Sequence, residues 1–372
     1  MSYDNIRQPN NQYTKSTEWS RANEPIWNKE IEGKYIHYPN MYELYHTFSK
    51  IFNVPIDNFI LTSGCEESLK ISLQVLKDFI KIRESGNLDC KTELVCESPT
   101  WGLAELIMNQ YADRRHIFKK RKFVDYLSRI NEQNELIKQD VDYNISYSTS
   151  VFNGLFLHEG CIVLDNKLET YQDNKIIDCG LSNIKYQSFN IIDEVYHLSS
   201  LRNKYDPWTN YGSYCDIGKR PKDPIDNENY NYIFIGSFSK IFGAGFRLGY
   251  IYYNKRFNNL MKYYRPQYIS SSAVDLINIL CDKHKKNKNI FYNFDESMSK
   301  CIHKSIEFRK RFKERPIYYS EHPNFISVDE VSLKKYSSLL ELDNYQIDKR
   351  FKLNNIDMVR LCRPLDFTLK DI

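Results

Sequence analysis

The chain has 372 residues, of which 41% are hydrophobic and 27% are charged, and its formal net charge is +4. This composition is typical of a soluble globular protein of about two domains, and the small charge gives no case for a nucleic-acid partner. Nine cysteines without a Cys-x-x-Cys pair argue against a disulfide framework or a zinc site, so we expect a reducing compartment and no metal. The N-terminus lacks an apolar signal region, and no run approaches the roughly 18 apolar residues of a membrane helix. We therefore expect a cytoplasmic protein without a membrane partner.

The first elements after an irregular arm are a helix, a strand and a second helix. Met41 to Phe52 has the spacing of an amphipathic helix, and 58–62 reads as a strand. A turn of small residues at 63–65 then opens a helix that reaches about Ile82. Free backbone N–H groups meet at such a turn, so it suits an anion such as phosphate. The alternative is an ordinary helix cap by Ser63.

The next strand, 93–97, is followed by Ser98-Pro-Thr-Trp101 and a helix from Leu103 to Tyr111. Trp101 either packs on the surface or forms one wall of a slot for a flat ring. The basic residues between 114 and 122 read as a solvated face, and the pattern predicts a helical segment at 124–137.

Three later strands end on polar residues. The strand 143–147 is followed by Asn153, and the strand that begins at Gln187 ends on Asp193, with Tyr196 close behind. The apolar run from Tyr232 leads into Ser237-Phe-Ser-Lys240, a glycine-rich turn and Arg247. Lys240 is either a salt-bridge partner or a Schiff-base lysine, whose amine must be partly desolvated.

The alternation of strands and helices over residues 40–255 predicts a parallel sheet covered by helices. Ligands of such sheets bind at the carboxyl ends of the strands. The polar and aromatic groups singled out above all follow strands, so we expect them to gather at one edge of the sheet.

These motifs together resemble the fold-type I pyridoxal-phosphate enzymes of the class I/II aminotransferase group, and most of all the histidinol-phosphate aminotransferase type. The most specific matches are Asp193-Glu-Val-Tyr196 and Ser237-Phe-Ser-Lys240, followed by Gly-Phe-Arg247-Leu-Gly. Ser98-Pro-Thr-Trp101, the turn after Thr62 and Tyr38-Pro39 agree with the same family. The resemblance covers roughly residues 20 to 365 and implies pyridoxal 5'-phosphate as cofactor.

The resemblance implies a role for each matching residue. Lys240 would be the Schiff-base lysine and proton shuttle, Asp193 would pair with the pyridinium, and Tyr196 would donate to the ring hydroxyl. Trp101 would stack on the ring, and Arg360 would bind the substrate carboxylate. The remaining residues would hold the phosphate: Ser63, Gly64, Cys65, Ser237, Ser239, Arg247 and, reaching across to a partner subunit, Tyr38.

One departure from the family concerns the asparagine that bonds the ring hydroxyl, because the chain has no Asn-Pro-Thr-Gly stretch. Asn153 lies where that motif should fall, and Asn166 is the alternative by its distance from Asp193. We assign Asn153. The stretches 155–188 and 199–230 then read as insertions that reshape the substrate entrance.

The resemblance implies a large cofactor-binding domain at 37–265, with a mostly parallel, helix-covered sheet. A smaller α/β domain would combine the N-terminal arm, 1–36, with the C-terminal region, 266–372. It also implies a homodimer with shared active sites.

The predicted function is transamination of an amino acid or amino-bearing phosphate, with 2-oxoglutarate or glutamate as partner. The alternative enzyme is a decarboxylase or lyase that uses the same cofactor on an amino acid or amino-acid phosphate. A different class, a non-catalytic binding protein with the same fold, is disfavoured because Lys240, Asp193, Tyr196 and both arginines are all present.

Overall fold

The computed structural model describes the following residues: 13–14, 38–52, 54–84, 90–98, 101–122, 124–125, 143–149, 151–152, 155–158, 161–162, 187–193, 195, 232–240, 242, 244–286, 321–322, 325–336, 346–353 and 356–362. No helix among these residues is both long and apolar enough to cross a membrane.

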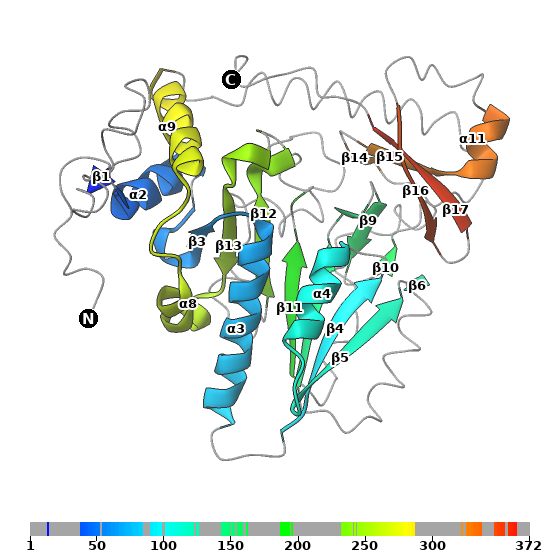
Figure 1. The fold of residues 1–372 in the computed structure, drawn as a ribbon, viewed down its shortest axis with the longest axis horizontal. Coiled ribbons are helices and arrows are strands. Elements are labelled where there is room, and N and C mark those ends of the chain that lie inside the picture. Colours follow the sequence, from blue (N-terminus) through cyan, green and yellow to red (C-terminus); the bar gives the residue numbers. More distant parts are fainter. Residues whose placement is uncertain are drawn as a thin grey trace, which may run out of the picture.

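A seven-stranded sheet with the order β3-β13-β12-β11-β7-β4-β5 forms the centre of the fold (Figure 1). Its strands are β3 (Phe59–Thr62), β4 (Thr92–Ser98), β5 (His116–Lys122), β7 (Tyr143–Thr149), β11 (Gln187–Asp193), β12 (Tyr232–Ser237) and β13 (Gly249–Tyr253). The neighbours from β12 to β5 pair in parallel, whereas β13 is antiparallel to both β12 and β3. The prediction of a mostly parallel sheet is therefore confirmed, with β13 as the one strand of opposite direction.

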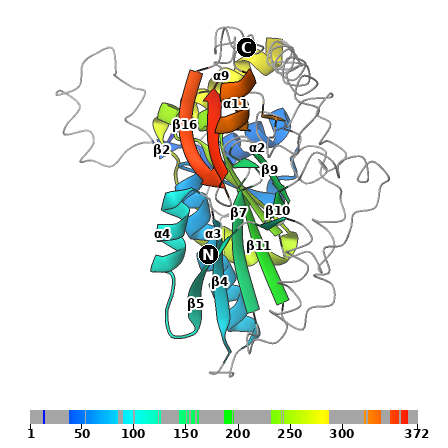
Figure 2. The same ribbon diagram turned by 90° about the vertical axis from the view of Figure 1, so that its right-hand side faces the viewer.

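Two helices lie on one face of this sheet, as Figure 2 shows from the side. They are α3 (Cys65–Arg83) and α4 (Gly102–Gln110), and α8 (Asn258–Tyr264) packs against α3. Leu69, Leu73, Leu76 and Ile80 form the buried stripe of α3, at the spacing of one helix face. This stripe attaches α3 to the sheet and so determines where its N-terminus lies.

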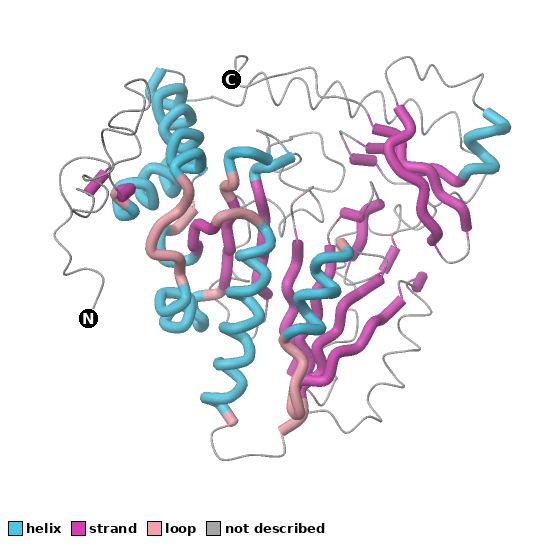
Figure 3. Tube along the Cα trace, in the orientation of Figure 1, coloured by secondary structure: helices cyan, strands magenta, loops and turns pink. Residues whose placement is uncertain are grey.

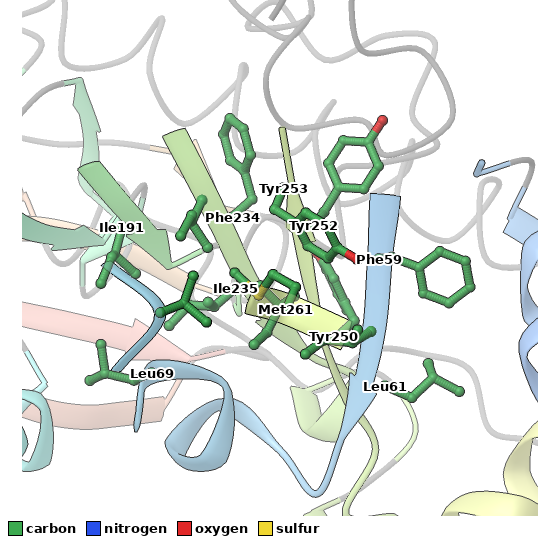
Figure 4. Packing of buried hydrophobic residues seen from close by; sticks show 14 of the residues in the cluster. Phe59, Leu61, Leu69, Ile191, Phe234, Ile235, Tyr250, Tyr252, Tyr253 and Met261 are labelled. Carbon is green, nitrogen blue, oxygen red and sulfur yellow. The ribbon is translucent and has the colours of Figure 1, made fainter. Parts of the chain in front are cut away.

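The core between helices and sheet is rich in aromatic side chains (Figure 4). Tyr250, Tyr252 and Tyr253 of β13 are all buried, and so is Phe59 of β3, which pairs with Tyr252. The helix α2 (Met41–Phe52) contacts α9 (Ser271–Lys286). Phe48 of α2 meets Phe238 edge to face, with ring centroids 5.8 Å apart. These contacts support the turn that follows β12, which carries the Ser-Phe-Ser-Lys motif.

Smaller sheets are hydrogen-bonded separately from the central one (Figure 3). The C-terminal sheet has the order β14-β15-β17-β16, and a further sheet has the order β6-β10-β9-β8. Their elements are β6 (Val124–Asp125), β8 (Val151–Phe152), β9 (Leu155–His158), β10 (Cys161–Ile162), β14 (Glu321–His322), β15 (Phe325–Asp329), β16 (Gln346–Leu353) and β17 (Ile356–Cys362), with α11 (Glu330–Tyr336) between β15 and β16. Near the N-terminus β1 (Tyr13–Thr14) pairs with β2 (Tyr38–Pro39).

The stretch 114–125 differs from its sequence interpretation. Residues 116–122 form β5, an edge strand, and 124–125 form the short strand β6. The predicted helix is wrong at its first two residues, and the rest of it lies outside the described residues. Charged residues are common on edge strands because they discourage pairing with other chains, which explains why this strand lacks an apolar signature.

Candidate active site

The helix α3 begins at the carboxyl end of β3 with an N-terminus that has no side-chain cap. Its N-cap residue is Gly64, whose φ of 107° lies in a region that favours glycine. The Ser63 backbone N–H donates to the Glu67 carboxylate at 2.6 Å. Ser63 is therefore not the helix cap, which removes the alternative reading of this turn and leaves an N-terminus suited to an anion.

Arg247 lies directly against this helix N-terminus. A Cβ atom built on Gly64 would be 3.2 Å from one guanidinium nitrogen of Arg247. Arg247 itself has a φ of 51°, a left-handed conformation that is costly for a residue other than glycine. A cation next to the positive end of a helix is unfavourable by itself, whereas an anion bound there is attracted by both. The predicted neighbours 63–65 and Arg247 thus come together across nearly two hundred residues.

Asp193 ends β11 as a buried carboxylate with only 2% of its surface exposed. The Tyr147 hydroxyl donates to Asp193 Oδ2 at 2.6 Å, and the Val195 backbone N–H donates to Oδ1 at 2.8 Å. A buried charge is costly unless it is hydrogen-bonded, and these donors offset that cost. The arrangement presents a fixed carboxylate at the carboxyl end of a parallel strand.

Cys65 connects this carboxylate with the start of α3. Burial raises the pKa of the Cys65 thiol, and the charge of Asp193 and a hydrogen bond to it raise this pKa further. The thiol therefore stays protonated and donates toward Asp193, which makes it a poor nucleophile. The sequence predicts Cys65 only as one of the residues that hold the phosphate, and its side chain adds this link.

The turn after β12 is held by Ser237, whose hydroxyl is buried. The Ser237 hydroxyl donates to the Leu248 carbonyl at 3.2 Å and accepts from the Ser239 backbone N–H at the same distance. These bonds join the two ends of the loop between β12 and β13. Lys240 is the last residue of the 3₁₀ helix η9 (Phe238–Lys240), directly after β12. A second 3₁₀ helix, η10 (Ala244–Phe246), leads to Arg247.

Trp101 occupies the N-cap position of α4, just beyond β4. Its side chain is half-buried and packs against the hydrophobic core. This position agrees with both sequence interpretations, since a tryptophan that packs on one side can cover a ring on the other.

Two of the remaining predicted residues belong to sheets other than the central one. Tyr38 belongs to β2, where it pairs with Thr14. Arg360 is half-buried in β17 of the C-terminal sheet, opposite Ser327 of β15. Asn153 and Tyr196 lie outside the described residues.

Sequence reasoning did not select Tyr147, although its hydroxyl bonds the candidate site's buried acid. A weak signal was present, because Tyr143, Ile145 and Tyr147 alternate along one strand and all three are buried. That pattern predicts a core-facing tyrosine but not the partner of its hydroxyl.

Residues 182–352 match the sequence model of the family "Aminotransferase class I and II". The matched region contains Asp193, Lys240 and Arg247. No curated protein sequence shows significant similarity to this chain.

Solved structures with the same fold include several aminotransferases. A candidate histidinol-phosphate aminotransferase from Erwinia carotovora atroseptica superposes with a TM-score of 0.57 and 17% identity, over 96% of this chain and 90% of that one. The histidinol-phosphate aminotransferase from Clostridium acetobutylicum gives 0.53 and 18%, over 96% and 94%. An archaeal alanine:glyoxylate aminotransferase gives 0.52 and 13%, over 95% and 82%. At these identities the likeness establishes the fold.

Proposed function

We propose that this chain, whose residues 182–352 match the class I and II aminotransferase family, transfers amino groups with pyridoxal 5'-phosphate bound covalently to Lys240. The family is pyridoxal-phosphate-dependent and acts on an amino donor and an oxo-acid acceptor. The proposed donor is an amino acid or an amino-bearing phosphate, and the proposed partner is 2-oxoglutarate or glutamate.

The observation that carries this proposal is a pair of sites at the carboxyl ends of strands in one sheet. After β3, the start of α3 has no side-chain cap and lies against the Arg247 guanidinium, and Asp193 is a buried carboxylate at the end of β11. Pyridoxal phosphate needs both groups, because its phosphate is an anion and its ring nitrogen becomes a cation on protonation. The described residues thus fit the cofactor.

Each described residue would contribute to binding in a distinct way. The first N–H groups of α3 and the Arg247 guanidinium would hold the phosphate. Asp193 would hold the proton on the ring nitrogen, and Trp101 would cover the ring. The loop fixed by Ser237 and Ser239 would set the position of Lys240.

Bound pyridoxal phosphate supplies a carbonyl carbon for the amine and a ring that accepts electrons from the substrate α-carbon. The protein supplies the proton transfers. The Lys240 amine would take the α-proton of the bound substrate and release it again, as a general base and acid. Arg360 would hold the substrate carboxylate with two parallel hydrogen bonds. Tyr196 and Asn153 would bond the ring hydroxyl.

The test is an absorption spectrum of the purified protein with added pyridoxal phosphate, compared with Lys240→Ala. We expect a visible band that is lost in the variant. A protein that stays colourless with cofactor contradicts the proposal. In a single turnover with a panel of amino acids, conversion of the cofactor to its amine form supports transamination. Release of carbon dioxide without an oxo acid supports the decarboxylase alternative instead.

We further propose that the protein acts as a cytoplasmic homodimer, in which Tyr38 reaches the phosphate of the partner subunit. Support comes from Tyr38-Pro39, whose place in the sequence resembles the family's shared-site tyrosine. Light scattering of the holoenzyme tests the assembly. A monomer that retains full activity contradicts it.

A further inference from the structure

Tyr147 is a buried tyrosine that the proposed function does not use. It lies in β7 with none of its surface exposed, and its hydroxyl donates to Asp193 Oδ2 at 2.6 Å. A buried polar group without a hydrogen-bond partner destabilises the fold. The bond between Tyr147 and Asp193 therefore offsets the burial of both the hydroxyl and the carboxylate.

The position of Tyr147 follows from the register of the sheet. β7 lies between β4 and β11, and Tyr147 pairs with Cys96 on one side and Ile191 on the other. Asp193 is two residues beyond Ile191, on the same face and near the carboxyl end of its strand. The tyrosine side chain is long enough to span this diagonal, whereas a shorter hydroxyl residue is not.

We propose that Tyr147, with the Cys65 thiol as a second donor, is a positioning residue that fixes the orientation and the negative charge of the Asp193 carboxylate for the cofactor ring nitrogen. The inference rests on the proposed function, which assigns Asp193 to that nitrogen. Tyr147 acts only through Asp193 and is not itself a catalytic residue.

Both carboxylate oxygens are held by separate donors. Tyr147 holds Oδ2, and the Val195 backbone amide holds Oδ1. Two donors on different oxygens fix the plane of the carboxylate. Hydrogen bonds to the ionised form of an acid also favour that form, and a neutral aspartic acid could not hold a protonated ring nitrogen.

The two side-chain donors keep their own protons. Burial raises the pKa of Tyr147, and the negative charge of Asp193 raises it further. The Cys65 pKa is raised for the same two reasons. Donors of this kind stabilise a neighbouring charge without giving up a proton to it. The thiol is the weaker donor, so the larger effect belongs to Tyr147.

The decisive variant is Tyr147→Phe, and its matched control is Tyr143→Phe. Tyr143 lies on the same strand and the same buried face, but its hydroxyl bonds Glu84. Apoprotein is titrated with pyridoxal phosphate and followed by tryptophan fluorescence. We expect the dissociation constant to rise about tenfold in Tyr147→Phe and to stay unchanged in Tyr143→Phe, because a hydrogen bond to a charged group is lost only in the first.

A pH series and a double-mutant cycle separate positioning from general packing. Loss of the donor makes the carboxylate easier to protonate, so the acid limb of cofactor binding should move to higher pH in Tyr147→Phe. In an Asp193→Asn background the same substitution should have no further effect on affinity. An unchanged acid limb, or an equal loss of affinity in both backgrounds, overturns the inference.

Two further results complete the test. Should Tyr147→Phe fail to fold, Cys65→Ala is expected to weaken cofactor binding and Cys65→Ser to restore it relative to Ala, and equal affinities in the two would overturn the inference. Failure of the wild-type protein to bind pyridoxal phosphate refutes the proposed function and this role with it. Tight binding by the wild type with no change in Tyr147→Phe refutes the role of Tyr147 alone.

Discussion

Gly249 lies so close to Gly64 that a Cβ atom on Gly249 would come within 2.7 Å of the Gly64 α-carbon. The same atom would be 2.7 Å from the Thr62 hydroxyl oxygen. Gly249 begins β13 and pairs with Thr62 at the end of β3. The glycine after Arg247-Leu is thus required by the close approach of two backbones at the start of α3.

Gly249→Ala should therefore damage both stability and cofactor binding. Overpacking against backbone atoms typically costs about 1–3 kcal/mol, and here the displaced atoms belong to the turn that would hold the phosphate. Urea unfolding and a pyridoxal phosphate titration measure the two effects. The control is Gly245→Ala, because a Cβ there meets nothing within 4 Å. Equal stability and affinity in the two variants would show that the close approach is not important.

Arg247→Gln should weaken the binding of pyridoxal phosphate by about tenfold or more, since a charge-assisted contact to the phosphate is lost. The binding of pyridoxal, which lacks the phosphate, should change by less than about twofold. Titration of the variant with both compounds provides its own control. A similar loss of affinity for both would mean that Arg247 supports the fold of the loop and not the phosphate.

Asp113 stabilises the turn before β5, and its contribution should depend on pH. Burial by itself would raise the pKa of Asp113, but hydrogen bonds from His116, from the Arg115 amide and from Lys77 hold this pKa well below its usual value of 3.8. A carboxyl group whose pKa is lowered by folding stabilises the protein fully at pH values above its unfolded pKa. This contribution is lost as the pH falls from there through the folded pKa.

Because the Asp113 side chain is about half exposed, solvent screens its interactions. Asp113→Ala should therefore lower the free energy of unfolding by less than about 1 kcal/mol at pH 7, and the difference from wild type should shrink below about pH 4. Urea unfolding at several pH values measures this. Asp282→Ala is the control, because its ion pair with Lys285 is long, at 3.5 Å, and exposed. A pH-independent effect of Asp113→Ala would contradict the assignment.

Tyr143 predicts a second pH dependence, at the alkaline end. Burial raises the pKa of Tyr143 to about 12, and the hydrogen bond to Glu84 contributes to the rise. The folded state then keeps this proton between about pH 10 and 12, where an unfolded tyrosine ionises, so the stabilising contribution is lost across that interval. Between about pH 10 and 12, Tyr143→Phe should lose less stability than wild type in urea unfolding. Equal losses of stability in Tyr143→Phe and wild type would mean that a different group titrates in this pH range.

Several parts of the site could be predicted from local sequence alone. Strands such as 187–193 and 232–237 can be recognised from their apolar runs. The groups that follow them must reach the same edge of the sheet, because parallel strands run in the same direction. The order of Asp193, Lys240 and Arg247 within their motifs likewise needs no structure, since each motif is a contiguous stretch.

Other parts depended on contacts between distant segments. Tyr147 meets Asp193 because β7 and β11 are neighbours in register, and Arg247 covers Gly64 because β13 inserts antiparallel between β3 and β12. Strand order and register arise from the packing of the whole sheet, which no local pattern encodes. The sequence by itself therefore determined which chemical groups are present and at which edge of the sheet they lie. Only the tertiary structure decided which groups touch, because a contact such as that of Cys65 with Asp193 depends on every strand packed between them.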